Sequence, residues 1–493
     1  MKRLFVIITL ILAAASFYTW LIQPEQQEEV PVLYWKSDAN PQRYEQIRLF
    51  HKWLIDKGHV NEKGRPEVEL RLDPSSPQTS MIHAVSGVGG DVIDVYEVTR
   101  FFHSMGVAED LTPYAAKGHY DISHTYPGLD GLFVFDGRQY AYLCNGSVYN
   151  MWFNVDTLKK YGMSPPPEEW TPEEFEKYAV EYVKKANADN PNPRLFFGQS
   201  ITGQDGFLLC ITRSEGYDFY NETLTSSTVD NPATQKALKL FYKWTYKDRL
   251  FPTSADVASA NDAGGYGGMN YSQFINGKLA MIIAGRFALI RFRELSEPLT
   301  VCSSQYPMYG FKNMIVSARS VIMYKGSKHK DLARLFFEFL ADREYNEYII
   351  EGSDGLPPNP SYAVGNPKYL SPRPNEGNVH SAELKWALKC SYSNAISPYF
   401  NLLGTNWTTQ AMGKYFSEQA TAEEALAEAQ MRYNMGIADT IRDNSELRAR
   451  WEKGVTDQKI IDECKREGKK IPAKLIANPF YLGYYRSRGM LEE

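Results

Sequence analysis

Few residues of this chain stand in an arrangement typical of catalysis. Two acidic pairs, Asp91 with Asp94 and Glu351 with Asp354, are of the type that glycosidases use, but such residues more often cap helices or face solvent. The eight histidines are scattered, and no two have the i, i+4 spacing of a metal-binding helix. The glycine-rich segment 264–268 lacks the lysine of a phosphate-binding loop and is interpreted as a flexible loop. The sequence therefore indicates no catalytic residue, no metal site and no cofactor.

Length, charge and cysteine usage exclude several other classes. A chain of 493 residues is too long for one compact core, so we expect two or more lobes. The net charge of -5, without any Lys/Arg-rich block, argues against a nucleic-acid partner. The aromatic content of 14% suits a protein that stacks rings on sugars or other flat ligands. The five cysteines form no CxxC pair, so neither a zinc site nor a disulfide framework is indicated, although one isolated disulfide is compatible with the sequence.

The N-terminal segment has the pattern of an export signal. Lys2 and Arg3 precede an apolar run over 4–22, and an acidic linker follows it. Three alanines at 13–15 offer a cleavage site, but the run is nearly long enough to span a bilayer, so a retained signal anchor is the competing interpretation. We expect residues 1–29 to be a signal peptide or signal anchor plus linker. The rest of the chain is then periplasmic or otherwise extracytoplasmic.

Alternating strand and helix patterns open the folded part of the chain. Residues 30–35, 68–72 and 91–98 have strand character, and amphipathic helical patterns lie between them. This order predicts a parallel α/β sheet, whose ligands bind beyond the carboxyl ends of the strands, here near 35–38 and 97–100. Further strands are expected at 139–142, 147–153, 280–284 and 321–324, and helices at 171–187, 231–248, 271–276, 328–348, 380–395, 405–417 and 421–440.

Four separated segments have a common order that is typical of one protein family. They are 149–175, with a helix start at Thr171-Pro172 and Glu174; 90–95; 274–285; and 325–340 with 355–357; and the segment 421–426 closes the series. In this order they resemble the signature of extracellular solute-binding proteins, the receptors of ABC importers. The sugar-binding branch (family 1), which includes maltose-binding protein, is the most similar in length and pattern. Ile93 departs from the pattern, because proline is usual at that position.

The resemblance implies an α/β, two-lobed periplasmic-binding-protein fold (type II). Each lobe is then a mostly parallel sheet flanked by helices, and ligand binds in a cleft at a hinge. The chain should cross between the lobes near 143–147, 297–303 and 350–357. Lobe 1 then takes 30–144 and 303–352, and lobe 2 takes 147–297 and 357–440. Residues 443–493 form a C-terminal extension without a counterpart in the family pattern, interpreted as an extra surface helix or, alternatively, a segment that wraps the lobes or meets a partner.

Matching to the family pattern gives twelve candidate ligand-binding residues. They are Trp35, Ser37, Asp38, Thr99, Arg100, Asn145, Gln204, Tyr266, Arg286, Arg319, Asp354 and Trp407. A sugar site needs planar polar groups for hydroxyls and rings for the apolar sugar face. Trp35 and Trp407 have suitable rings, but each could equally pack a core. Arg286 stands where the family usually has an aromatic residue, and with Arg319 it raises the hypothesis of an acidic sugar or another anionic ligand.

The function implied by the resemblance is binding without catalysis. The protein would be the extracytoplasmic component of an ABC transporter that delivers a carbohydrate, an oligosaccharide or an acidic sugar, to the permease transmembrane subunits. We expect a monomer, with a membrane tether through residues 4–22 if that segment is retained. A secreted carbohydrate-active hydrolase or lyase of two-lobed shape is the main alternative. A membrane-anchored sensor or adaptor that reuses the fold is another.

Overall fold

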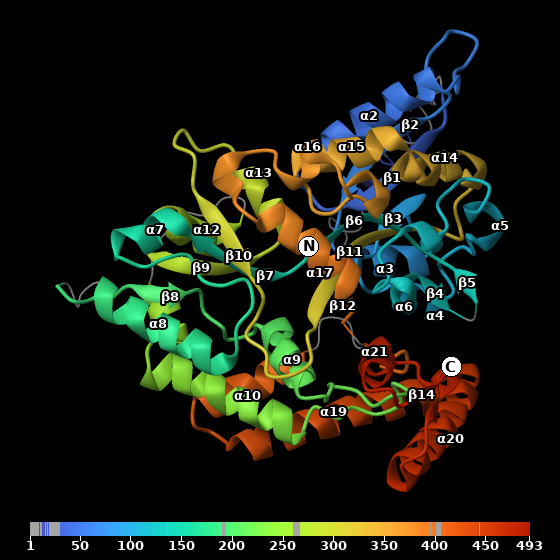
Figure 1. Cartoon of the computed structure of the whole chain (residues 1–493). Helices are drawn as coiled ribbons and strands as arrows, with labels where there is room; N and C mark the ends of the chain where they lie inside the picture. Colours follow the sequence, from blue (N-terminus) through green and yellow to red (C-terminus); the bar gives the residue numbers. More distant parts are fainter. Residues whose placement is uncertain are drawn as a thin grey trace.

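The computed structural model describes residues 30–135, 137–189, 194–259, 267–394, 396–400, 406–442 and 444–493, together with 9, 12–14, 16 and 18. These residues form two α/β lobes and a C-terminal segment, which is drawn in red in Figure 1. Within these ranges, no helix combines the length and the apolar character needed to cross a membrane. All five cysteines carry free thiols.

The first lobe is built on a six-stranded mixed sheet. Its strands are β1 (Val32–Ser37), β2 (Glu69–Pro74), β3 (Val92–Asp94), β6 (Tyr142–Val148), β11 (Met314–Met323) and β12 (Ser391–Tyr392). The strand β1 pairs in parallel with β2 and β3, while β11 is antiparallel to β3 and β6. The helices α2 (Gln42–Asp56) and α3 (Pro77–Val85) connect the first three strands, which confirms the predicted strand–helix alternation.

One face of this sheet is covered by three helices. They are α2, α14 (Lys330–Ala341) and α15 (Arg343–Gly352). Trp35, Phe50 and Phe336 meet there, with ring centroids 5.1–5.6 Å apart between Phe336 and the other two. The helix predicted over 328–348 is divided at Asp342, whose extended backbone (ψ 158°) ends α14 and begins α15.

The second lobe contains a four-stranded sheet in the order β10-β7-β9-β8. Its strands are β7 (Asn150–Asn154), β8 (Phe196–Gly198), β9 (Leu279–Ala284) and β10 (Val301–Ser304). The expectation of a mostly parallel sheet is wrong for this lobe, because β7 is antiparallel to both β9 and β10 and only β8 pairs in parallel. The physical reason is that β7 continues directly from β6, with only Tyr149 between them, so the crossing fixes its direction.

The chain changes from one sheet to the other at positions that differ slightly from those expected. The first change occurs at Tyr149, since residues 143–147 all lie within β6. The second occurs over 305–313, because residue 303 lies inside β10, which pairs with β7 of the second sheet. At the third, Leu356 forms a bridge with Gly146 of β6. The helix α17 (Val379–Lys389) packs against β6, β10 and β11, and so contacts strands of both sheets.

The remaining α-helices and strands of the two lobes are short or peripheral to the crossings. They are α4 (Thr99–Ser104), α5 (Thr112–Ala115), α6 (Asp130–Phe133), β4 (Val134–Phe135), β5 (Arg138–Gln139), α7 (Val155–Lys160), α8 (Pro172–Ala186), α9 (Asp205–Ser214), α10 (Pro232–Tyr242), α11 (Ser254–Ser259), α12 (Gly268–Ile275), α13 (Leu289–Phe292), α16 (Pro367–Leu370), α18 (Trp407–Phe416) and α19 (Ala422–Arg442). The predicted capping box of α8 is present, with Thr171 and Glu174 bonding reciprocally. The helix predicted over 380–395 ends earlier, at Lys389, because β12 follows it.

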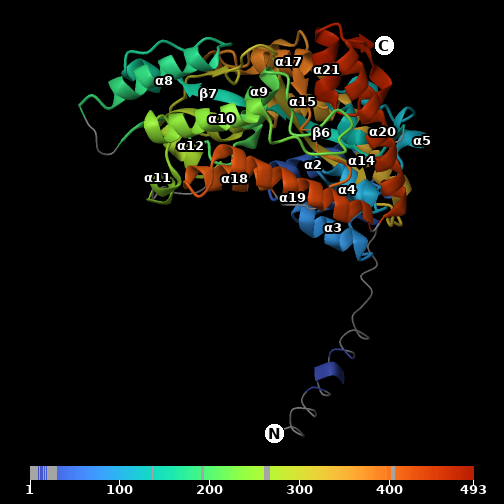
Figure 2. The same ribbon diagram turned by 90° about the horizontal axis from the view of Figure 1, so that it is seen from below.

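The C-terminal segment is more than one added helix. It contains α20 (Ser445–Glu467), β13 (Ile471–Pro472), α21 (Pro479–Ser487) and β14 (Leu491–Glu492), with β13 and β14 paired in parallel. We call residues 444–493 the tail. Its buried residues, among them Ile461, Phe480 and Leu491, form a small core of their own. The tail lies against the second lobe and close to α4 of the first lobe in both Figure 1 and Figure 2.

Candidate functional site

A cleft of about 640 Å³ opens where the chain crosses between the two sheets. This volume is within the range of ordinary small-molecule sites. The first lobe lines it with the loop after β1, Tyr96 just beyond β3, the strands β6 and β11, and the turn after α15. The second lobe contributes Phe287. The lining residues are Asp38, Ala39, Asn40, Pro41, Arg43, Tyr96, Asn145, Gly146, Ser147, Tyr149, Phe287, Ser317, Arg319, Asp354 and Gly355.

The floor of the cleft is a network of charged side chains around two arginines. Arg319 donates from Nη1 to Asp94 at 2.9 Å and from Nε to the amide oxygen of Asn145 at 3.1 Å. Arg43 donates to Asp354 at 2.8 Å and to Asp38 at 3.0 Å. Both arginine side chains are at most 5% exposed. Buried charges of this kind are stable only when paired and hydrogen-bonded, and these two are.

Strand pairing places these groups beside one another. Asn145 of β6 and Arg319 of β11 are register partners, and a bulge follows Arg319. Asp38 and Tyr96 come just after β1 and β3, which are neighbouring parallel strands, so both lie at the carboxyl edge of the sheet. Tyr96 has a positive φ of 50°, an uncommon conformation for a non-glycine residue, and its hydroxyl donates to Asp38 at 2.8 Å. Parallel strand order and this backbone turn therefore create the polar edge of the cleft.

The electrostatics favour the ionised form of Asp38. Burial alone raises the pKa of Asp38, but Arg43 and Arg319 beside it outweigh burial and hold its pKa below the ordinary value. Burial raises the pKa of Tyr96, and the carboxylates Asp94 and Asp38 raise it further, so this hydroxyl remains a hydrogen-bond donor. Asp94 and Asp354 are the other two carboxylates of the floor, so three carboxylates surround the two arginines. Asp38, whose side chain is 39% exposed, thus presents a carboxylate to the cleft.

Aromatic rings form the rest of the lining. Tyr149, the residue between β6 and β7, is 37% exposed and meets Phe287 edge-to-face at 5.7 Å between ring centroids. Phe287 comes from the second lobe and Tyr96 from the first, so rings of both lobes border the same space. Rings beside carboxylate and amide oxygens are suited to a ligand with an apolar face and hydroxyl groups around its edge.

The structure brings together four of the twelve residues predicted from sequence. Asp38, Asn145, Arg319 and Asp354 line the cleft. Tyr266 lies outside the described residues.

Three predicted residues lie beneath the cleft rather than on its surface. Trp35 is fully buried and donates from Nε1 to Asp94 at 2.8 Å, so it packs the sheet instead of stacking on ligand. The hydroxyl of Ser37 also donates to Asp94, and Thr99 is fully buried next to Ser320. Their direct ligand role is wrong, because Trp35 and Ser37 bond the buried carboxylate of Asp94 and Thr99 is itself fully buried.

Three other predicted residues lie elsewhere. Arg100 stacks its guanidinium on Phe135, 4.4 Å from the ring centroid, and lines a separate cavity. The Gln204 carbonyl accepts from the first turn of α9. Trp407 begins α18 and packs under the guanidinium of Arg432, 4.8 Å from its ring centroid. These three are not among the described residues that line the cleft.

Arg286 has a structural role in place of the predicted one. It is fully buried, and its guanidinium donates to the carbonyls of Ile349, Ile350 and Gly355, at the carboxyl end of α15 and just beyond it. A helix end leaves its last carbonyls unpaired, so a cation there satisfies both the hydrogen bonds and the helix dipole. Its Nε donates to His380 at 2.9 Å. The hypothesis that Arg286 binds an anionic ligand is therefore wrong, because its donors are used within the protein.

A second charged network surrounds Arg286, and we call it the hinge cluster. Glu383 of α17 accepts from the hydroxyl of Ser147 and the amides of Val148 and Arg286, at 2.9–3.0 Å. Burial raises the pKa of Glu383 to about 7.

Two residues of α17 and its preceding turn complete the hinge cluster. His380 accepts from Arg286 at Nδ1 and lies 2.7 Å from Glu376 at Nε2. Burial lowers the pKa of His380 to about 4, and Arg286 lowers it as well. The pKa of Glu376 falls to about 2 because the bonds from Arg293 and His380 outweigh its burial.

Several lining residues were missed from sequence, and some had a usable signal. Tyr149 lies in the segment that carried the family pattern, but it was interpreted as part of a strand. Phe287 follows Arg286 directly and is the aromatic residue expected near that glycine, displaced by one position. Arg43 and Tyr96 had no such signal, because a pairing across 311 residues and a positive φ are products of the fold.

Comparisons with known proteins fit this geometry. A family model described as "Bacterial extracellular solute-binding protein" matches residues 62–347, more than half of the chain. A putative binding protein of Brucella abortus (strain 2308) is 25% identical over 267 residues, which cover 52% of this chain and 59% of that protein. The match thus spans about 59% of the length of this curated relative.

Solved structures share the fold. An ABC substrate-binding protein from Listeria monocytogenes in complex with cycloalternan has a TM-score of 0.69 at 19% identity, over 83% of this chain and 99% of that chain. The sugar-binding protein MalE from Xanthomonas citri has a TM-score of 0.64 at 16% identity, over 83% of this chain and 98% of that chain. At these identities the likeness shows the two-lobed fold alone.

Proposed function

This chain belongs to the bacterial extracellular solute-binding proteins, and from this premise we propose that its cleft binds a neutral carbohydrate without chemical change. The observation that carries the proposal is the combination at one opening of a carboxylate, amide and guanidinium floor with the rings of Tyr96, Tyr149 and Phe287. Planar polar groups can bond paired sugar hydroxyls, and rings can pack on the apolar face of a pyranose.

Binding and transport follow from the two-lobed fold. A ligand that touches both lobes only when they are close stabilises the closed form by its differential affinity for it. Phe287 from the second lobe and Asp38 from the first both line the cleft and would supply such a pair of contacts. The closed form is the one that the transmembrane subunits of an ABC permease would recognise, so the protein delivers its ligand to them.

The location proposed for the protein is outside the cytoplasm, as the export-type segment 1–29 indicates. If residues 4–22 are retained, they tether it to the membrane. Immunoblotting of membrane and soluble extracytoplasmic fractions, with the mature N-terminus sequenced, tests both statements. A mature N-terminus beyond residue 22 would contradict the tether.

The proposed function is tested by a ligand screen that also tests for catalysis. Maltose, maltotetraose, tagatose and mannitol are titrated while thermal unfolding is followed, and the recovered ligand is analysed by chromatography. A saturable rise in Tm with unchanged ligand supports the binding function, because a ligand that binds only the folded state stabilises it. Shortened saccharides in the recovered fraction would favour the hydrolase alternative instead.

A further inference from the structure

The exposed side of α3 is apolar and carries no Asp, Glu, Lys or Arg. The segment 74–90, which contains α3 and the loops on either side of it, has none of these residues, in a chain of which 23% is charged. Ile82, Val85 and Val88 are each at least 51% exposed within this segment. Figure 2 shows α3 at the outer edge of the molecule, on the side opposite α17. Apolar surface of this kind marks a site of contact with a partner.

The packing of α3 on the first lobe does not use these exposed side chains. Met81 and Ala84, on the inner side of the helix, are buried in the same core as Ile93 of β3. Ile82 and Val85 lie on the outer side and are exposed. The helix is therefore held on the sheet by its inner side, and its outer side is available to a partner.

Tyr34 of β1 extends the exposed apolar surface. Its side chain is 44% exposed, although the other residues of β1 are buried. Its carbonyl accepts from the amide of Asp91 and its amide donates to the carboxylate of Asp91, each at 2.9 Å, so it lies beside the loop that follows α3. A tyrosine has an apolar ring and a polar hydroxyl, a combination suited to the boundary between lipid and water. We call Tyr34, Ile82, Val85 and Val88 the α3 patch.

The chain enters the folded part of the protein next to the α3 patch. The apolar run over 4–22 is followed by the linker, and β1 begins at Val32, two residues before Tyr34. An extended chain gains at most about 3.6 Å per residue, so residues 23–31 span roughly 30 Å at most. When residues 4–22 are retained in the membrane, the α3 patch is therefore held close to the lipid surface.

We propose that the α3 patch rests on the lipid bilayer to which residues 4–22 tether the protein. Its aliphatic side chains then lie at the boundary between the headgroups and the acyl chains. Four side chains bind lipid weakly by themselves, but the tether makes the contact intramolecular and so raises the effective concentration of lipid. The inference rests on the tethered form of the proposed function. Such docking fixes the first lobe relative to the membrane and leaves the second lobe free to close over the ligand.

The test uses a tryptophan placed in the patch as a reporter of lipid contact. The full chain with Val88→Trp is reconstituted into phosphatidylcholine vesicles whose acyl chains carry bromine, a quencher of tryptophan emission at short range. Subtraction of the wild-type signal removes the emission of the nine native tryptophans. Most of the added emission should be lost in brominated vesicles and kept in unbrominated ones. The loss should not depend on NaCl concentration, because the patch is uncharged.

Ile55→Trp is the matched control on the same lobe. Ile55 is 48% exposed and lies near the end of α2. The buried residues of α2 pack with Val92, whereas those of α3 pack with Ile93, and adjacent residues of a strand point to opposite faces of its sheet. The two reporters therefore lie on opposite sides of the first lobe, and the emission added by Ile55→Trp should not be quenched.

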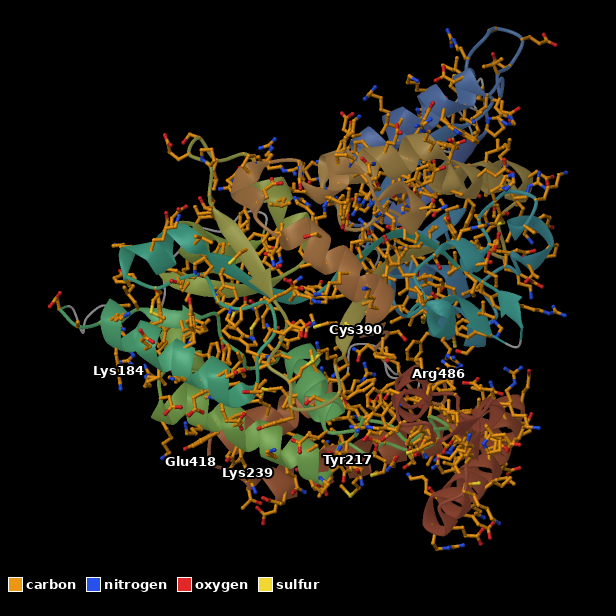
Figure 3. All side chains as sticks on the ribbon, viewed as in Figure 1. Lys184, Tyr217, Lys239, Cys390, Glu418 and Arg486 are labelled. Carbon is orange, nitrogen blue, oxygen red and sulfur yellow. The ribbon has the colours of Figure 1, made fainter. Side chains whose placement is uncertain are left out.

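Two sets of variants in the Val88→Trp background test the other members of the patch. Ile82→Gln with Val85→Gln should remove most of the quenching and leave Tm unchanged, because both side chains are exposed. Tyr34→Ala should weaken the quenching. Tyr217→Ala is its matched control, since Tyr217 is 42% exposed, and Figure 3 places it on the second lobe, well apart from the position of α3 in Figure 1.

Flotation of the vesicles with the full chain separates the possible failures. Flotation without quenching at residue 88 would overturn the docking while the tether stands. Absence of flotation would overturn both, because the docking requires the tether. A shift of the added emission to shorter wavelength that depends on protein concentration and not on lipid would assign the patch to a second copy of the chain, and would also overturn the proposal. Carbohydrate titration of the same preparation reports separately on the cleft.

Discussion

Two buried arginines of this protein, Arg319 and Arg286, stand in similar surroundings but perform different tasks. Arg319 donates to side chains, Asp94 and Asn145, in the floor of an open cleft. Arg286 donates mainly to backbone carbonyls at and just beyond the end of α15, in a sealed hinge cluster. The difference shows that the residue type alone does not decide the role of a buried arginine. Its hydrogen-bond acceptors and the presence of an open cleft decide whether it belongs to a ligand site or stabilises the surrounding structure.

The same contrast extends to the carboxylates. Asp38 is partly exposed, and two arginines hold its pKa below the ordinary value. Glu383 is sealed by the peptide groups that it accepts from, and burial raises its pKa to about 7. An ionised group at the cleft can bond a ligand, whereas a group that is readily protonated at the hinge avoids the cost of a buried charge.

The largest expected effect is on the hinge cluster. Arg286→Met leaves three carbonyls without donors and should lower the free energy of unfolding by about 3–5 kcal/mol. Urea unfolding followed by fluorescence measures this. Arg291→Met is the control: Arg291 of α13 is 42% exposed, its ion pair within the described residues is with Glu294, and its replacement should change stability by less than about 0.5 kcal/mol. Equal losses in the two variants would show that the carbonyl contacts of Arg286 are unimportant.

The second effect is a pH dependence with opposing contributions in the hinge cluster. Glu383 keeps its proton to about pH 7 in the folded state, so its contribution is full below the unfolded pKa of 4.5 and is lost as pH rises toward 7. His380 resists protonation down to about pH 4, so its contribution is full above 6.5 and is lost as pH falls. Glu383→Gln removes the first contribution only.

The variant should therefore gain stability relative to the wild type as pH rises from 4.5 to 7. The expected change in the difference between the two unfolding free energies is about 2–3 kcal/mol. Chemical denaturation at half-unit pH steps measures it. Parallel profiles of wild type and Glu383→Gln over this window would refute a raised pKa for Glu383.

The third effect is on the cleft. Asp38→Ala removes the partly exposed carboxylate and should weaken binding of a carbohydrate found by the screen by roughly tenfold or more, which is about 1.4 kcal/mol. Asp73→Ala is the matched control, because Asp73 is also partly exposed at a strand end and pairs with Lys36 outside the cleft lining. Calorimetry on both variants measures the difference. If Asp73→Ala lost as much affinity as Asp38→Ala, the proposed contact between Asp38 and the ligand would be contradicted.

The smallest expected effect on ligand affinity is at Trp35, where the variant separates packing from ligand contact. Trp35→Phe loses the 2.8 Å bond to Asp94 and should lower stability by about 1–2 kcal/mol, while leaving carbohydrate affinity within twofold. Denaturation and calorimetry on the same preparation measure both quantities. A large loss of affinity with unchanged stability would return Trp35 to the ligand site.

Parts of the fold could be predicted from the sequence because they depend on local residues or on the periodicity of apolar residues. Strand–helix alternation over 30–98 and the capping box at Thr171 were both predicted and are present. The direction of β7 was not predicted, because it depends on the single-residue connection through Tyr149, which a periodicity argument does not register.

The candidate site was accessible only in part. Asp38 and Asn145 were predicted through the family resemblance, and Asp38 also follows a strand that ends at the ligand-binding edge of a parallel sheet. The burial of Trp35 and the bonds from Arg286 to helix carbonyls were not predicted. Each depends on partners that are distant in sequence, such as Asp94 and Ile349. A residue type therefore indicates which contacts are chemically suitable, but tertiary packing decides which are made.

The most direct test of the central claim is a calorimetric titration of the wild type and of Tyr149→Ala with the best saccharide from the screen. Tyr149 is 37% exposed at the crossing, so its replacement should leave the unfolding free energy within about 1 kcal/mol. The account predicts one saturable site in the wild type and an affinity at least roughly tenfold weaker in the variant, because the ring packs on the sugar face. Identical affinity in the two proteins would contradict the placement of the carbohydrate in this cleft.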